Sequence, residues 1–484
     1  MLSDEQIFRH NRWWRSAGWE ADDPHLRRLE ESPLRLPTPQ VDEIELGQPA
    51  VHVLRGPRQV GKSTDLKLLV RRALAAGIDP LGIVYLSLDL LEDQPPSVLV
   101  ESVIRAFELA GGESPRMVLL DEVTAAGSWQ TAVKVLWDEG RIDRDVVVCT
   151  GSSAIDLAGG AAERLPGRRG AGRDFLVMPQ GFASFSRALD GTIPPGPGMT
   201  VADIVTAAGQ ETLLGARVHL SALQHALESY LQFGGLPAAV AEAAGGAATP
   251  SSAVEAVLWD SIVKEVQRRG ASIAAIQALF ERVMRSLGSK VSWSRLAREM
   301  DVPLGPPRRR GRKGPDPRTL QSYVELLAIN YFALVVYFWK PDSGSGELTK
   351  DKKIYFGDPL LHTVTAERLG LQRNPHAEIE NAVALALYRR YEPTERSAEN
   401  MVAPERLHVW GTRRGGEIDF VCGPRRQIEA VEVADWGNVN RQKATAPARA
   451  FPGHPSLVAT RDELDFGRSA NLVPAALLLW ALSD

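Results

Sequence analysis

The pattern of apolar and polar positions predicts alternating strands and helices between residues 50 and 190. Short apolar runs are typical of buried strands, and the segments between them have helical spacing. From Thr64 to Ala76, for example, apolar residues fall on one helix face, at Leu66, Leu69, Val70 and Ala73. Strands that alternate with helices form a parallel sheet covered on both faces. The predicted strands are Val51–Leu54, Gly82–Leu88, Met117–Leu120, Val146–Thr150 and Phe175–Met178.

The pattern changes after residue 190. A Gly/Pro-rich stretch, Gly191–Gly198, predicts a loop or boundary. Residues 218–290 are helical in pattern, and from about residue 345 short strands and turns surround one long helix, Ile379–Tyr391. We therefore expect an α/β chain of several domains. The predicted parts are an N-terminal extension (1–45), a parallel-sheet core (46–190), a helical lid (191–290), a middle domain (291–345) and a C-terminal α/β domain (346–484).

The segment between the first strand and the first helix carries the pattern G-x-x-x-x-G-K-[ST] of a phosphate-binding P-loop. Its glycines let successive backbone N–H groups point at phosphate oxygens, and the helix dipole favours an anion. We expect Lys62 to reach the β- and γ-phosphates of ATP and Ser63 to bind Mg²⁺. The alternative is a Gly-Pro turn with an unrelated lysine. The expected nucleotide-binding residues are Gly56, Pro57, Arg58, Gln59, Val60, Gly61, Lys62, Ser63 and Thr64.

Two carboxylates follow the predicted strand Met117–Leu120. Ligands bind α/β sheets at the carboxyl ends of their strands. Asp121 is therefore expected to hold Mg²⁺, directly or through water, and Glu122 to act as the catalytic base that orients the attacking water. The alternative is an acid that caps a helix.

Three further positions are candidates for contact with the γ-phosphate. Thr150 or Ser152, at the tip of the next strand, is the candidate sensor, with a helix N-cap as the alternative. An arginine in the Gly-rich stretch 163–173 suits a neighbouring subunit's phosphate, because guanidinium is planar and always charged. We favour Arg168 and then Arg164, and a solvated basic loop is the alternative.

Bulk properties narrow the class of protein. A chain of 484 residues predicts about three domains, and a net charge of −4 gives no global attraction to nucleic acid. Two distant cysteines, Cys149 and Cys422, suggest neither a disulfide framework nor a cysteine metal site. The N-terminus has no signal-peptide pattern, and the apolar runs are too short to span a bilayer. We expect a cytoplasmic protein with no membrane partner.

The middle domain follows a winged helix-turn-helix outline. Ser292–Met300 reads as a capped helix, Thr319–Tyr331 as a second, and Leu334–Phe338 as a strand. A basic, Pro/Gly-rich loop joins the helices, and its charge favours DNA phosphates without reading bases. The alternatives are a solvated loop or a protein-binding module. The expected DNA-binding residues are Arg308, Arg309, Arg310, Arg312 and Lys313.

The C-terminal domain has the outline of a PD-(D/E)xK nuclease hairpin. Such an enzyme needs an Asp and a Glu on adjacent strands to hold Mg²⁺, and a Lys two positions after the Glu to activate water. Asp419 and Glu432 occupy the carboxylate positions, but Ala434 stands in place of the lysine. Lys443 is a loosely spaced substitute. We expect an inactive nuclease-like fold that binds DNA or supports assembly.

The chain resembles a prokaryotic AAA-type ATPase family whose members carry a C-terminal domain of unknown function with a restriction-endonuclease-like fold. The resemblance implies a P-loop AAA+-type core at 46–190, a winged-helix-like middle and a nuclease-like tail. The motifs that carry it span nearly the whole chain. They are Asn11–Arg15, Leu54–Ser63, Leu120–Val123 with Ser128–Trp129 and Lys134, Thr150–Ser153, Arg164–Arg168, Met178–Phe182, Phe233–Pro237, Lys353–Pro359 and Glu417–Phe420.

These observations favour a homo-oligomeric, ring-forming or otherwise assembled ATPase that couples ATP hydrolysis to work on DNA. Translocation or branch migration of branched DNA would be such work, as in a helicase or translocase. The alternative is a nucleotide-dependent signalling switch or toxin–antitoxin-type regulator that moves no DNA. An active Mg²⁺-dependent nuclease is the third hypothesis.

Overall fold

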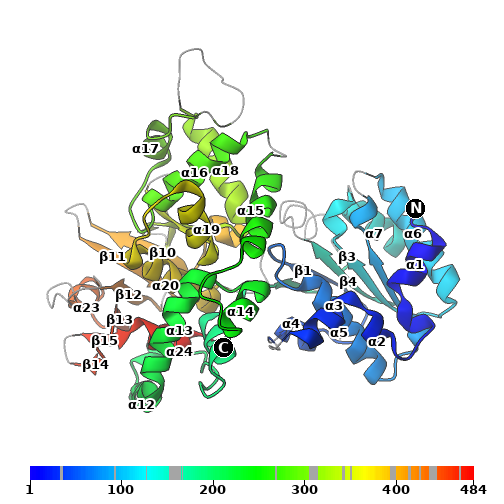
Figure 1. The fold of residues 1–484 in the computed structure, drawn as a ribbon, viewed down its shortest axis with the longest axis horizontal. Coiled ribbons are helices and arrows are strands. Elements are labelled where there is room, and N and C mark those ends of the chain that lie inside the picture. Colours follow the sequence, from blue (N-terminus) through cyan, green and yellow to red (C-terminus); the bar gives the residue numbers. More distant parts are fainter. Residues whose placement is uncertain are drawn as a thin grey trace. The chain divides into compact units, whose positions relative to one another are not determined.

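The computed structural model describes all residues except 33–35, 37, 92–93, 127, 152–164, 166, 268–269, 303, 305–313, 341–343, 349–350, 393–398, 413–415, 425–426, 435–443, 468–469 and 484. The chain forms two compact units (Figure 1). The first spans Met1–Met178, and the second spans Pro179–Pro393 with Glu399–Asp484. This division is coarser than the five predicted parts, whose bounds stay a prediction.

The first unit contains the predicted parallel sheet. Its strand order is β2-β3-β4-β1-β5, and every neighbouring pair is parallel. β4 lies between β1 and β3. The loop after β1 and the acids at the end of β3 therefore flank the carboxyl end of β4. The strands are β1 (Ala50–Arg55), β2 (Ile83–Ser87), β3 (Met117–Asp121), β4 (Val146–Gly151) and β5 (Asp174–Leu176).

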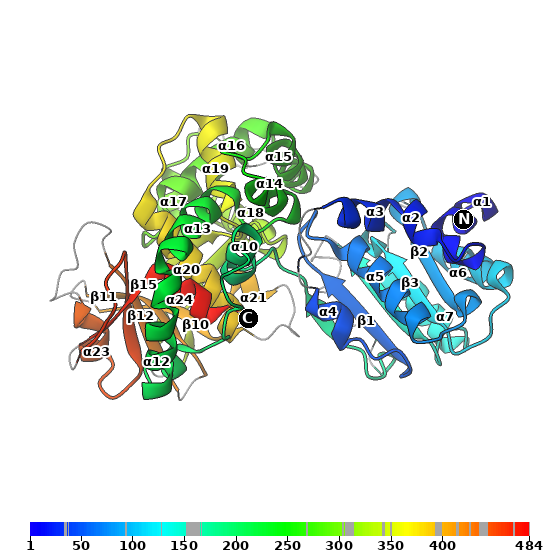
Figure 2. The same cartoon turned by 60° about the horizontal axis from the view of Figure 1, so that its bottom comes forward.

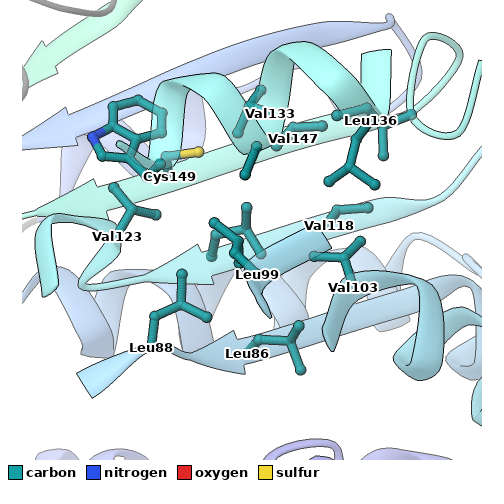
Figure 3. Packing of buried hydrophobic residues seen from close by; sticks show 14 of the residues in the cluster. Leu86, Leu88, Leu99, Val103, Val118, Val123, Val133, Leu136, Val147 and Cys149 are labelled. Atoms are coloured by element: carbon teal, nitrogen blue, oxygen red, sulfur yellow. The ribbon is translucent and has the colours of Figure 1, made fainter. Parts of the chain in front are cut away.

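Helices cover both faces of this sheet (Figure 2). Alternate strand residues point to opposite faces. On one face α5 (Lys62–Ala75) packs through Leu66, Leu69 and Val70. On the other, α6 (Pro96–Ala110) and α7 (Trp129–Asp138) pack on strand valines and leucines. Figure 3 shows this second core, in which side chains of β2, β3 and β4 pack with those of α6 and α7. Its labelled members are Leu86, Leu88, Leu99, Val103, Val118, Val123, Val133, Leu136, Val147 and Cys149.

The N-terminal segment of the chain closes the outer edge of β2. The Asn11 side chain accepts from the Tyr85 N–H at 2.7 Å and donates to the Tyr85 carbonyl at 2.9 Å, as a paired strand would. The indoles of Trp13 and Trp14 both donate to the Ile83 carbonyl. Ile83 is the first residue of β2. These two contacts therefore lie at the amino ends of the strands, whereas the P-loop lies at their carboxyl ends. The elements are α1 (Asp4–His10), η1 (Arg12–Trp14), α2 (Trp19–Asp22), α3 (Pro24–Glu31) and α4 (Pro39–Glu43).

The second unit begins with helices and continues into a small antiparallel pair, β6 and β9. Ser292 caps α17, as predicted, by accepting from the Arg295 N–H. The helices are α10 (Phe182–Leu189), α11 (Val201–Ile204), α12 (Ala207–Ala216), α13 (Leu220–Phe233), α14 (Pro237–Ala244), α15 (Ser252–Gln267), α16 (Ile273–Arg285), α17 (Trp293–Arg298) and α18 (Pro317–Ile329). The strands are β6 (Ala333–Tyr337), β7 (Trp339–Lys340), β8 (Ser345–Gly346) and β9 (Lys352–Phe356).

The second unit ends in a mixed sheet ordered β10-β11-β12-β13-β15-β14. The predicted hairpin is present, because β11 and β12 pair antiparallel with Phe420 opposite Val431. The strands are β10 (Leu407–Gly411), β11 (Glu417–Cys422), β12 (Glu429–Val433), β13 (Ser456–Thr460), β14 (Asp465–Phe466) and β15 (Asn471–Pro474). The helices are α19 (Leu360–Leu369), α20 (Pro375–Tyr391), α21 (Glu399–Val402), α23 (Ala446–Ala450) and α24 (Ala475–Leu482). Within the described ranges, no helix has both the length and the apolar character needed to cross a bilayer.

Candidate active site

The loop between β1 and α5 has the backbone of an anion cradle. Gln59 and Gly61 have positive φ angles of 65° and 107°, which turn the chain sharply into the helix. Gly61 is the N-cap and has no side chain with which to cap α5. A Cβ on Gly56 would lie 2.0 Å from the Val177 carbonyl oxygen, so only glycine fits there. The first turn of α5 therefore presents N–H groups that suit phosphate oxygens.

Lys62 lies inside this loop. Its side chain is 4% exposed, and its ammonium donates to the carbonyls of Gly56 at 2.9 Å and Pro57 at 2.8 Å. Burial lowers the pKa of Lys62, and the nearby negative charges of Glu122 and Asp121 oppose this shift. A buried cation whose hydrogen bonds go to neutral carbonyls gains strongly from an approaching anion, because the local dielectric is low. The loop residues thus fit a bound triphosphate.

Asp121 ends β3 with both carboxylate oxygens engaged. Oδ1 accepts from the Thr150 hydroxyl at 2.5 Å, and Oδ2 accepts from the Tyr85 hydroxyl at 2.7 Å. The Thr150 hydroxyl also accepts from the Glu122 N–H at 3.0 Å. Thr150, predicted as a phosphate sensor, therefore positions both acids in this structure. A carboxylate oriented in this way is a suitable ligand for Mg²⁺.

Glu122 has a left-handed backbone, with φ 53° and ψ 45°. A non-glycine residue in this region costs about 1 kcal/mol or more, and such residues cluster at functional sites. The bond from its N–H to Thr150 holds this conformation. The turn ends β3 abruptly and begins η4 (Val123–Ala125). The candidate base thus sits at the strand end, next to Asp121.

Sequence reasoning missed Lys67, which contacts the ring of Tyr85, the tyrosine that donates to Asp121. Lys67 is buried in α5, with its ammonium 3.3 Å from the centroid of the Tyr85 ring and 3.6 Å from Asp23 Oδ2. It also donates to the His10 carbonyl. Burial lowers the pKa of Lys67 to about 8 against the attraction of Asp23 and Asp121. The one available signal was a lysine on the apolar face of a predicted helix.

Arg168, the favoured arginine, is paired within its own chain. Its guanidinium meets Asp138 at two points, Nε to Oδ1 at 2.5 Å and Nη2 to Oδ2 at 3.1 Å. The side chain is 28% exposed. Arg164 and Ser152 lie outside the described residues.

The candidate DNA-binding residues, Arg308, Arg309, Arg310, Arg312 and Lys313, also lie outside the described residues, as does Lys443. The structure does bring Asp419 and Glu432 together on β11 and β12, where Glu432 Oε2 accepts from the Asp419 N–H at 3.2 Å. Across the described ranges, however, no three acidic, histidine or cysteine side chains are arranged to hold a metal ion.

Comparison with known families matches two parts of the chain. Residues 48–185 match a family described as an AAA domain, and residues 224–371 match a domain of unknown function, DUF8612. The AAA match covers the whole five-stranded sheet and the P-loop, and the parallel sheet with its flanking helices fits a P-loop domain of that type. No curated protein matches the chain.

Three solved structures show weak similarity. An ORC1 protein of Aeropyrum pernix in complex with DNA is 14% identical, with a TM-score of 0.28 over 74% of this chain and 96% of its own. An ORC2 protein of the same organism is 11% identical, with a TM-score of 0.31 over 72% and 92%. A katanin structure on self-assembly is 16% identical, with a TM-score of 0.22 over 42% and 73%. At TM-scores below 0.5 these matches identify neither a fold nor a function for this chain.

Proposed function

We propose that the protein is an AAA-type ATPase that binds ATP with Mg²⁺ and hydrolyses it. The observation that carries the proposal is the meeting, at one sheet edge, of the P-loop with Lys62 and of Asp121 with Glu122. Cleavage of a phosphoanhydride needs a positioned triphosphate, a bound cation and an oriented water. These residue types supply each of the three.

The residues divide the work by their chemistry. The Lys62 ammonium and the backbone N–H groups of residues 56–64, except Pro57, which has none, would bind the phosphates. Ser63 and Asp121 would hold Mg²⁺, which neutralises charge on the phosphate oxygens when bound. Glu122 would orient the attacking water, and Thr150 would keep both acids in place. An arginine from a neighbouring subunit, Arg168 or Arg164, would complete the site.

Turnover of the full-length chain tests these roles. Lys62→Ala should abolish hydrolysis by weakening phosphate binding, and Glu122→Gln should retain bound ATP while losing turnover. Arg27→Ala is the control, because Arg27 lies exposed on α3 of the same unit. Normal turnover in both site variants would refute the assignment.

We further propose that hydrolysis drives work on DNA by a homo-oligomer, such as translocation or branch migration. The basic charge of residues 308–313 supports a DNA contact. The order α17, α18, β6, β9 supports a winged-helix-like domain, and the bridge between Val291 and Lys352 adds a third strand position. Neutralising the five basic residues should weaken DNA binding and flatten its salt dependence, measured by fluorescence anisotropy.

A nucleotide-dependent switch is the second candidate function. The pairing of Arg168 with Asp138 favours it, because a switch needs no arginine from a neighbour. The two candidates differ in their response to DNA. ATPase rates measured with duplex, forked, four-way and single-stranded DNA should rise for a DNA motor. Rates that no DNA changes, together with no retardation of duplex or branched DNA, would favour the switch.

A further inference from the structure

Lys353, in β9 of the second unit, lies at the centre of converging carboxylates. Its side chain is 1% exposed. The ammonium is 2.8 Å from Asp419 Oδ1, 2.8 Å from Glu417 Oε1 and 3.0 Å from Glu380 Oε1. Glu380 belongs to α20 and the other two to β11. One cation thus ties a helix and two separate sheets together.

The neighbouring contacts complete a shell of negative charge. The Tyr355 hydroxyl donates to Glu380 Oε1 at 2.6 Å, and Glu432 accepts from the backbone of Asp419. The Val433 N–H donates to Asp419 Oδ2 at 2.9 Å. His376 faces the same helix carboxylate, with Nε2 3.9 Å from Glu380 Oε2. Three carboxylates therefore contact a single ammonium, and a fourth, Glu432, lies beside Asp419.

Neighbouring carboxylates repel one another, and protonation of some of them reduces this repulsion. Burial, followed by the charge of Asp419, raises the pKa of Glu380 to about 7 and that of Glu432 to about 8. The negative charges of Asp419, Glu380 and Glu417 favour the charged ammonium, so the pKa of Lys353 stays above its ordinary value despite burial. Three carboxylates within 3.0 Å of one ammonium form a cluster that demands positive charge.

Ammonium geometry accounts for the spacing. Three oxygens at 2.8–3.0 Å from the nitrogen satisfy its three donors. A divalent cation would need the same oxygens drawn in to roughly 2.0–2.6 Å. It would also face an ammonium in direct contact with its own ligands, and like charges at that range repel strongly. The two cations exclude each other.

We propose that Lys353 is the resident cation of this cluster, that it excludes divalent metal, and that removing its ammonium opens a Mg²⁺- or Mn²⁺-binding site formed by Glu380, Glu417, Asp419 and Glu432. The cluster thereby connects α20, β9 and β11 through ion pairs, without a metal ion. This inference concerns the second unit and does not rest on ATP hydrolysis by the first.

Calorimetric titration of Mn²⁺ into the nucleotide-free, full-length chain tests the inference. Lys353→Met should bind roughly one Mn²⁺ per chain more than the wild type, since four carboxylates then lack a cation. Lys352→Met is the matched control: Lys352 is equally buried, one residue earlier in β9, but lies over the Trp293 ring 4.2 Å from its centroid. It should bind no more Mn²⁺ than the wild type.

Thermal unfolding extends the test to a variant that folds poorly. If Lys353→Met is unfolded without metal, Mn²⁺ should restore folding, because the metal replaces the lost charge. Failure of Mn²⁺ either to bind the variant or to restore its folding would overturn the inference. So would Mn²⁺ binding by the wild type that Asp419→Asn abolishes.

Discussion

Thr150 and Asp121 form the contact on which the geometry of the candidate site most depends. One hydroxyl donates to the Asp121 carboxylate and accepts from the Glu122 N–H. A hydrogen bond to a charged group contributes about 1.5–3 kcal/mol. If that contact is needed to hold the acids for catalysis, its loss slows turnover more than it weakens nucleotide binding.

Thr150→Val should therefore lower kcat by about 10- to 100-fold, the factor that corresponds to one such bond, with KM changed little. Steady-state kinetics measure both constants. Thr131→Val, at an exposed position on α7, is the control. A lost affinity for ATP with kcat unchanged would instead indicate that Thr150 contacts the phosphate directly.

Glu432 gives the cluster around Lys353 a pH dependence with a definite sign. Its pKa is raised from 4.5 to about 8 in the folded chain. Between these values the folded protein keeps a proton that the unfolded chain has released, so its stability falls as pH rises. Lys353 stays charged throughout this range, because its pKa is raised.

Glu432→Gln removes this titration. The free energy of unfolding of the second unit should then fall less steeply between pH 5 and 8, by up to about 1.4 kcal/mol per pH unit relative to wild type. Urea unfolding at a series of pH values measures the slope. Glu463→Gln, an exposed carboxylate, should leave it unchanged. If the free energy of unfolding of Glu432→Gln falls with pH as steeply as that of the wild type, the raised pKa of Glu432 is contradicted.

At the residue scale the sequence predicted what is local. Lys62, Ser63, Asp121 and Glu122 sit in short motifs, next to the strands that place them. Lys67 and Lys353 escaped prediction as functional or structural centres, because their partners are distant in the chain. Asp23 caps the N-terminus of α3, and Asp419 lies in β11. No spacing rule joins such positions.

The edge of β2 shows how elements support the site. This outer strand carries Tyr85, whose hydroxyl holds Asp121, and its backbone is paired by the Asn11 side chain. The N-terminal segment therefore acts on the candidate site through β2. A sheet edge without such a partner leaves backbone groups unsatisfied.

Asn11→Ala should lower the free energy of unfolding of the first unit by about 3 kcal/mol, because the Tyr85 N–H and carbonyl lose their buried partner. Denaturant unfolding measures the change. Arg9→Ala, whose side chain is 68% exposed in an ion pair with Glu5, should cost less than about 1 kcal/mol. Equal effects of the two variants would show that the edge pairing is unimportant.

Element prediction succeeded where burial on both sides makes a strand almost wholly apolar. All five strands of the first sheet were found within a few residues. The start of α5 was placed at Thr64 and lies at Lys62, because Gly61 turns the chain directly into the helix. No local pattern predicts that Trp13 and Trp14 bind the Ile83 carbonyl, since tryptophan serves equally well against a core or a ligand.

The division into two units is a feature of the whole molecule. Hydrophobic periodicity identifies elements but not which cores they share. The first unit ends at Met178, directly after β5, and the Gly/Pro-rich stretch 191–198 falls inside the second. There the Gly198 N–H donates to the Ser483 carbonyl near the end of the chain.

Substitution of Arg168 tests whether several chains assemble so that one completes the candidate site of another. If Arg168 acts on a neighbour's nucleotide, Arg168→Ala should reduce turnover about 10³-fold or more. Asp138→Ala should leave turnover near wild type, because it removes only the partner within the chain. ATPase rates across a range of protein concentrations measure both. Equal, small effects of the two variants would mean that their pair is an ordinary surface ion pair.

The central claim, that a triphosphate binds between β1 and α5, has one direct test. Calorimetry of ATP and Mg²⁺ binding to the full-length Glu122→Gln chain measures it without interference from turnover. We predict saturable binding at one site per chain, lost when Lys62→Ala is added. An absence of binding heat for both adenine and guanine nucleotides, or equal binding with and without Lys62, would contradict the account.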